Sequence, residues 1–261
     1  MCPAVVDLCR ESVSEAAEVS ENVLSAFATL LAERSLTSDT IINVITMAVA
    51  AMWSTQVYSS DKGTEQPQEH QQLVERVILA HIIDLFRVLV TVSSGQIAEA
   101  VAASLRDETA SGGLVRFITA PFRRILPALR VSSQWLRFNI EHIQRHTAGP
   151  LQGANNRTVG DALRGFWTAY TTFVSQVDRV FPIEQLPKSI ILLDEDVELR
   201  GFIPFQYSGI SDAMAGLSAI ADSAKVHPNE EHLMRLRDIQ QDAAYFASMK
   251  VKYFLFDCQA P

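Results

Sequence analysis

The sequence predicts an all-α fold, an array of antiparallel helical hairpins with eight or nine helices. Residues that break helices are sparse, with 11 Gly and 10 Pro among 261 residues, and they cluster in a few places. Between these clusters, apolar residues recur at helical spacing in segments rich in Ala and Leu. Apolar residues make up 48% of the chain, enough for a sizeable core, and we expect one domain over residues 1–261.

The first expected elements form a helical hairpin. A helix is predicted from Val5 to Arg34, and a second from Thr40 to Tyr58, each with an apolar face. The turn between them, 35–39, is polar and can cap the second helix. So short a connection makes the two helices antiparallel neighbours.

The most apolar segment of the chain, 41–53, lies in the second of these helices. Asn43 and Thr46 interrupt it, and it is shorter than the ~20 residues that a membrane span needs. We therefore expect a buried helix there and no membrane partner.

The next stretch has two polar breaks. Residues 59–67 are a polar linker with Gly and Pro, which we interpret as a soft seam within the domain. A helix is expected over 68–92, ended by Ser93-Ser94-Gly95, and a short one over 97–105. A second polar break follows at 107–113.

Two long helices are predicted in the middle of the chain. The first runs from Pro121 to His146, and Pro127 should kink it or mark its true start. After a linker at 147–156, Thr158 is a plausible N-cap for the second, with Asp161 completing a capping box. Phe181-Pro182 should end that second helix.

The C-terminal part is less regular. Residues 183–208 have no clear helical period. Helices are expected over 212–225 and 228–249, and residues 253–256 look extended.

No enzyme, cofactor or metal site is expected. The sequence has no GxSxG, P-loop, dinucleotide-binding or HExxH motif, and its three cysteines lack metal-binding spacing, which favours a reducing compartment. His142 and His146 have a metal-ligand spacing on a helix, but neither has a carboxylate at a motif position, so we interpret the pair as coincidental.

Charge is unevenly distributed. The chain carries −8 overall, so no global positive field attracts nucleic acid or anionic lipid, yet residues 106–146 hold seven arginines against three acids. Arg123, Arg130 and Arg137 recur every seven residues and share one helix face, the arginine ridge. The ridge either binds phosphates or an acidic partner, or pairs with acidic neighbouring hairpins. The tentative binding residues are Arg116, Arg123, Arg124, Arg130 and Arg137.

One segment is distinctive, LDEDVELRGFIPF at 193–205. It resembles the signature of the telomerase and nonsense-mediated mRNA decay adaptors, the ever-shorter-telomere and Smg-type family. The LPA…WL pattern at 126–136, Phe166-Trp167, and HLMRLR at 232–237 followed by AAYF support the resemblance, which covers residues 70–255. The signature residues are Asp194, Glu195, Asp196, Glu198, Leu199, Arg200, Gly201, Phe202 and Pro204.

The signature has a structural interpretation. Arg200 would be anchored by one of the acids 194–196, which would fix a long loop against the hairpins. Gly201 permits a close backbone approach or a positive φ, and Pro204 would stop any helix.

The resemblance implies the central helical "DNA/RNA-binding" domain of the family, without the 14-3-3-like and PIN nuclease-like domains of full-length members. It implies a non-enzymatic adaptor or scaffold in mRNA decay or telomere maintenance, in the nucleus and cytoplasm. Such a protein would bind protein partners of an RNA-decay or telomerase complex and, weakly, single-stranded RNA or DNA. The alternative is a purely structural module that orients flanking domains; a hydrolase or metal enzyme is the least favoured interpretation.

Overall fold

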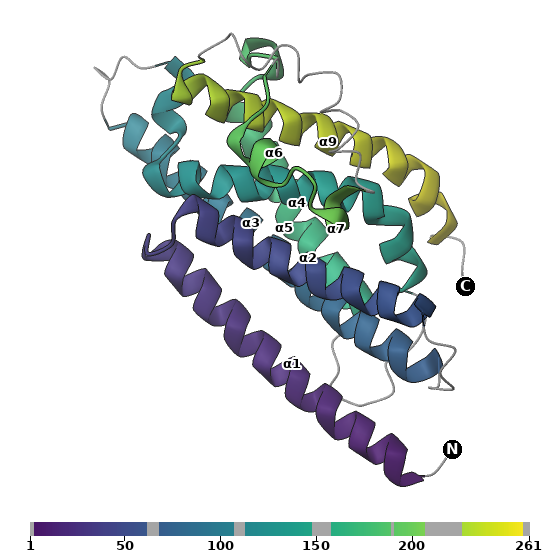
Figure 1. Ribbon diagram of the computed structural model, residues 1–261. Coiled ribbons are helices and arrows are strands. Elements are labelled where there is room, and N and C mark those ends of the chain that lie inside the picture. The colour runs from purple at the N-terminus through teal and green to yellow at the C-terminus, as the bar shows by residue number, and fades with distance from the viewer. Residues whose placement is uncertain are drawn as a thin grey trace. The chain divides into compact units, whose positions relative to one another are not determined.

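A computed structural model describes residues 3–61, 68–106, 113–147, 158–188, 191–206 and 226–257. Within these ranges the chain is all-α, as predicted, with eight α-helices, two short 3-10 helices and no strand (Figure 1). The helices are α1 (Pro3–Ala32), α2 (Ser38–Asp61), α3 (Gln68–Ser104), α4 (Ala120–Arg145), α5 (Val159–Val180), α6 (Asp194–Glu198), α7 (Ile203–Gln206) and α9 (Pro228–Asp257). The 3-10 helices are η1 (Gly113–Phe117) and η2 (Ile183–Gln185).

The chain divides into two compact units. Unit 1 comprises residues 1–93 and 140–171, and unit 2 comprises residues 94–139 and 172–261. The boundaries fall inside α3, α4 and α5 rather than at the expected seam, 59–67. At that seam α2 continues to Asp61, and residues 62–67 lie outside the described part of the chain.

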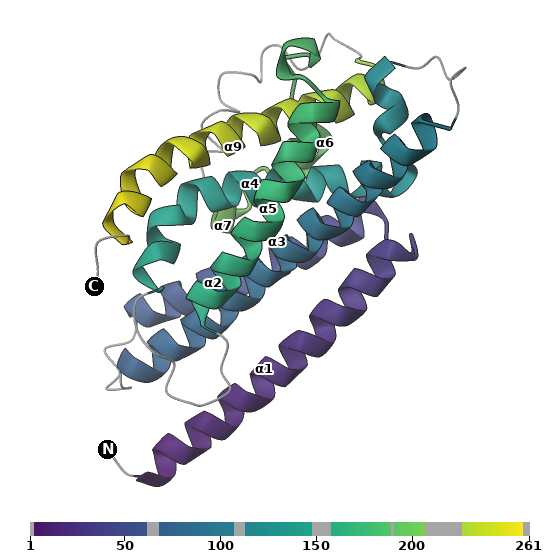
Figure 2. The ribbon, with the colours of Figure 1, turned by 180° about the vertical axis from the view of Figure 1, so that it is seen from behind.

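Unit 1 contains the expected N-terminal hairpin. In Figures 1 and 2, α1, α2 and the first part of α3 run alongside one another in alternating directions. Thr37 caps α2, because its hydroxyl accepts a hydrogen bond from the Thr40 N–H at 3.3 Å. The apolar faces form the core, in which Ile45, Leu79 and Ile82 are fully buried.

Two helices, α2 and α3, are long and apolar enough to cross a membrane by length and composition, over Ser38–Val57 and Gln72–Ser104. The core helix of a protein in water passes the same test, so this is weak evidence for a span. In the segment expected to be a buried helix, 41–53, residues Ile41, Val49 and Met52 are indeed buried.

The predicted break at Ser93-Ser94-Gly95 is wrong, because α3 continues through it to Ser104. A glycine inside a helix costs only about 1 kcal/mol relative to alanine. Burial on both sides of the break outweighs this cost: Ser93 and Ile97 are fully buried. The polar break expected at 107–113 is described only from Gly113, where η1 begins.

Helices α4 and α5 follow the sequence closely. Pro127 lies inside α4, which begins at Ala120, so the proline does not mark the helix start. At the start of α5, the Asp161 N–H donates to the Thr158 hydroxyl at 3.0 Å, and the Thr158 N–H donates to the Asp161 carboxylate at 3.2 Å. The predicted capping box is therefore confirmed.

Unit 2 is built around the part of α4 up to Asn139, and α9 runs beside it in both views (Figures 1 and 2). The stretch without helical period contains the short elements η2, α6 and α7. The extended segment expected at 253–256 is wrong, because α9 continues to Asp257. The linker at 147–156 is described only at Thr147, and the helix expected at 212–225 lies outside the described residues.

Candidate nucleic-acid interface

The signature acids of α6 form a buried ionic network in unit 2. Glu195 accepts hydrogen bonds from Arg235 Nε and Nη2, the shortest at 2.8 Å, and from Arg130 Nη1 at 3.3 Å. Arg130 also donates to Asp196 at 2.6 Å and to Asp238 at 2.7 Å. Exposed fractions are 1% for Glu195, 3% for Arg235 and 7% for Arg130, so the centre of the network is buried, while Asp238 at its edge is half-buried.

Asp196 has a second function at the start of α6. One carboxylate oxygen binds Arg130, and the other accepts a hydrogen bond from the Leu193 N–H at 3.0 Å. The first turn of α6 is therefore joined to α4 through a single side chain.

The ionic states follow from these contacts. Burial alone would raise the pKa of Glu195, but the hydrogen bonds from Arg235 and the charges of Arg130 and Arg235 outweigh it and lower the pKa. Burial opposes the charged form of Arg130, yet the three carboxylates around it raise its pKa. Both groups are held charged in the interior.

This arrangement corrects the expected role of Arg200. The acids at 195 and 196 do fix the signature segment, but their partners are Arg130 on α4 and Arg235 on α9. Arg200 is exposed in the turn after α6. Asp194, the first residue of α6, is also exposed. Arg235 lies in the HLMRLR segment, whose charge was visible in the sequence but whose partner was not.

The residues after α6 form a second short helix. Gly201 has a φ of +81°, as its type allows, and Leu199 ends α6. The prediction that Pro204 stops a helix is wrong, because it lies in the first turn of α7, where a proline's missing N–H costs nothing. The rings of Phe202 and Phe205 lie 5.7 Å apart, and Phe205 is buried.

Arg237 and Gln240 of α9 form a second set of contacts, with the segment that follows α5. Arg237 Nη1 donates to the carbonyls of Ile183 and Leu186 at 2.9 and 2.7 Å, and Gln240 donates to the Phe181 carbonyl at 2.8 Å. The segment between α5 and α6 is thereby fastened to α9.

The arginine ridge divides within unit 2. Arg130 is inside the ionic network, and Arg137 donates to the buried Asp242 at 3.1 Å while its guanidinium lies 4.7 Å from the Tyr245 ring centroid. At Arg130 and Arg137 the structure favours internal pairing, the second of the two interpretations of the ridge. Arg123 is exposed.

The three exposed arginines at the start of α4 and in η1, Arg116, Arg123 and Arg124, form what we term the arginine patch. Arg123 Nε donates to the Ile118 carbonyl at 3.1 Å, which orients the guanidinium. The Arg116 guanidinium lies 4.7 Å from the centroid of the Phe117 ring. Cations held beside an aromatic ring are groups that contact phosphates and bases in single strands.

His232 lies near this patch. Its pKa is lowered to about 4 by burial and by the positive charges of Arg235 and Arg123, against the charge of Glu195. The ring is therefore neutral at pH 7.

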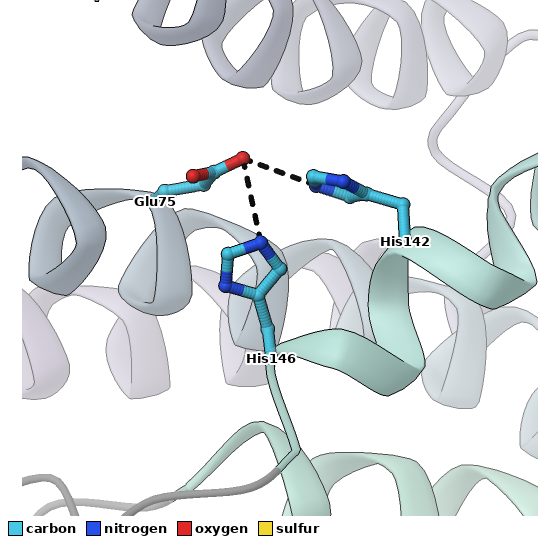
Figure 3. A group of neighbouring side chains, drawn as sticks. All are labelled: Glu75, His142 and His146. Atoms are coloured by element: carbon cyan, nitrogen blue, oxygen red, sulfur yellow. Dashed lines mark ion pairs between the residues drawn. The ribbon is translucent and has the colours of Figure 1, made fainter.

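A second polar cluster belongs to unit 1. His142 and His146, at the end of α4, both point toward one oxygen of Glu75 on α3 (Figure 3). The hydrogen bond to His142, aided by Gln56 and the charge of His146 and opposed by burial, lowers the pKa of Glu75 to about 2. The carboxylate missing from the sequence motif is thus supplied by another helix, more than 60 residues earlier in the chain.

Together, the helices and the buried ionic network define a domain of the all-α class with exposed arginines in η1 and at the start of α4. The sequence matches the Est1 DNA/RNA binding domain over residues 8–209, and the chain belongs to this family. The match begins earlier and ends earlier than the expected range of 70–255, and it includes the N-terminal hairpin and the signature. No curated protein matches the chain.

Proposed function

We propose that this chain is a non-enzymatic nucleic-acid-binding adaptor that contacts single strands through the arginine patch. The observation that supports this is the exposure of Arg116, Arg123 and Arg124, which lie in η1 and at the start of α4. Arg130 and Arg137 are less exposed and contact acids of α6 and α9. The membership of a DNA/RNA binding domain family supports the class of ligand.

The charge of the whole chain limits the affinity. With a net charge of −8, the field beyond the patch opposes a polyanion. We therefore expect micromolar or weaker dissociation constants at physiological salt for single-stranded RNA and DNA.

A salt series with fluorescein-labelled single-stranded RNA and DNA tests the interface. The variant R116E/R123E/R124E should weaken binding. The magnitude of the slope of log K against log salt should also decrease by about 2, at ~0.7 for each of three lost phosphate contacts. The control is R179E/K188E/R200E, which changes the net charge equally by reversing three exposed residues of unit 2. The control should bind like the unmodified chain, after allowance for the shared change in net charge.

Three outcomes are informative. Equal weakening of both triple variants would place the attraction in the overall charge and contradict the arginine patch. Full binding by R116E/R123E/R124E would mean that another surface is used. No binding by the unmodified chain would favour the alternative, a structural module that orients other domains.

We propose the finer role on the family resemblance: an adaptor in nonsense-mediated mRNA decay or telomere maintenance, present in the nucleus and cytoplasm, with protein partners from those complexes. Incubation of labelled RNA and DNA with the chain and Mg²⁺ or Mn²⁺ should leave the strands intact. Cleavage abolished by an internal Asp→Asn substitution would contradict the non-enzymatic assignment.

A further inference from the structure

We propose that Glu75, His142 and His146 form a zinc site in unit 1. The three side chains offer one ligand atom each, and these atoms lie within 4.8 Å of one another. Glu75 Oε1 is 3.0 Å from His142 Nε2 and 3.7 Å from His146 Nε2 (Figure 3). All three residues belong to the same unit, so their geometry is internal to it.

The two distances from Glu75 are close to those between the ligand atoms of a tetrahedral ion. Zinc binds His nitrogens at 2.0–2.1 Å and carboxylate oxygens at 2.0–2.2 Å, which separates the ligand atoms by about 3.3–3.5 Å. The separations from Glu75 to His142 and His146, 3.0 and 3.7 Å, lie on either side of this range, and all three ligand atoms lie within 4.8 Å of one another. Two histidines and one carboxylate are also a recurrent zinc ligand set, with a water molecule in the fourth position.

The helices hold the ligands in place. His142 and His146 are one helical turn apart at the end of α4, so their rings project from the same face, with centroids 4.7 Å apart. Glu75 lies on α3, and its side chain is 16% exposed. All three ligand residues are half-buried.

The polar contacts around His142 do not all form hydrogen bonds at once. Gln56 Nε2 lies 3.0 Å from Glu75 Oε1 and 3.1 Å from His142 Nε2. If His142 Nε2 donates to Glu75, it faces a second donor, Gln56. If it accepts from Gln56, its lone pair faces a carboxylate oxygen.

Rotating the Gln56 amide does not help, because its oxygen would then face Glu75 Oε1. With zinc present, His142 Nε2 directs its lone pair at the metal and Gln56 donates only to Glu75. Gln56 would then be the positioning residue for the ligating carboxylate.

The direct test is zinc titration of the chelator-treated full chain by calorimetry, with Co²⁺ absorption as the measure of tetrahedral geometry. One zinc ion should bind per chain and raise the unfolding temperature. H142A/H146A and the isosteric E75Q should lose this binding, and Q56A should weaken it by about 10–100-fold.

Matched controls separate this site from other ligands. H70A/H227A removes two other histidines, E141Q removes the exposed carboxylate next to His142, and C2S/C9S/C258S removes every thiol. All three should retain the binding. Equal zinc affinity in the unmodified chain and E75Q, or loss of binding in the cysteine variant, would overturn the proposal.

Discussion

The five arginines between 116 and 137 have two kinds of surroundings within one unit. Arg130 and Arg137 meet acids of α6 and α9, whereas Arg116, Arg123 and Arg124 remain exposed around the start of α4. Arg123 and Arg130 are seven residues apart on one helix face, yet Arg123 is exposed and Arg130 is buried, with an exposed fraction of 7%. Helical spacing states which residues share a face, but not which part of that face another segment covers.

The acids that cover the ridge come from far along the chain. Asp196 and Asp238 are 66 and 108 residues from Arg130. We therefore assign a stabilising role to Arg130 and Arg137, and the proposed ligand binding concerns the three exposed arginines. Three predictions test this division, beginning with the largest expected effect.

Glu195→Ala should lower the free energy of unfolding by about 3–5 kcal/mol, because Arg130 and Arg235 lose a shared partner in the interior. Urea unfolding followed by circular dichroism measures this. Glu184→Ala removes an exposed acid of η2 and should stay within about 0.5 kcal/mol of the unmodified chain. Equal midpoints for the two variants would show that the ionic network does not stabilise unit 2.

His232 reports on both groups of arginines, because Arg235 and Arg123 each lower its pKa. Its ring should titrate near pH 4 by NMR, and Arg123→Glu should raise that midpoint. Between pH 6.5 and 4, the unfolded chain takes up a proton at His232 that the folded chain does not.

Acidification through this window therefore removes stability, while above pH 6.5 His232 contributes no pH dependence. The His232→Gln variant should lose less stability than the unmodified chain between pH 6.5 and 4. If His232 titrated near pH 6.5 and Arg123→Glu did not change that midpoint, Arg123 would not lie close to His232. Such a result would weaken the assignment of the arginine patch.

Arg200→Ala should have the smallest effect, within about 0.5 kcal/mol, because Arg200 is exposed and the acids before it pair elsewhere. Thermal unfolding of the Arg200→Ala and Arg235→Ala variants measures the difference, because Arg235→Ala removes a buried side chain and should destabilise the fold far more. A loss of more than 2 kcal/mol in Arg200→Ala would restore the original interpretation of the signature.

Local features of the chain were predictable. The apolar periodicity gave most helices, and Thr158 with Asp161 gave the start of α5. These depend on residues within one or two helical turns, so the sequence contains all the necessary information. The continuous α3 was missed because burial around Ser93 outweighs the local cost of Gly95.

The sites were less predictable because their partners are distant. Glu195 and Asp196 were recognised as anchoring acids, but the nearest arginine in the sequence is not their partner. The pair His142 and His146 was visible, yet Glu75 joins it only after α3 packs beside the end of α4. Pairwise contacts across 40 or more residues require the tertiary fold.

The turn between α6 and α7 requires a residue that can adopt a positive φ at position 201. A Cβ built on Gly201 meets nothing within 4 Å, so the position has room for a side chain. Its φ of +81° is what L residues avoid, at a cost of roughly 1–2 kcal/mol. D-alanine prefers positive φ, so it would adopt this backbone conformation without that strain, and it would restrict the unfolded chain more than glycine does. The backbone conformation at position 201, and not the space around it, therefore disfavours L residues with a side chain.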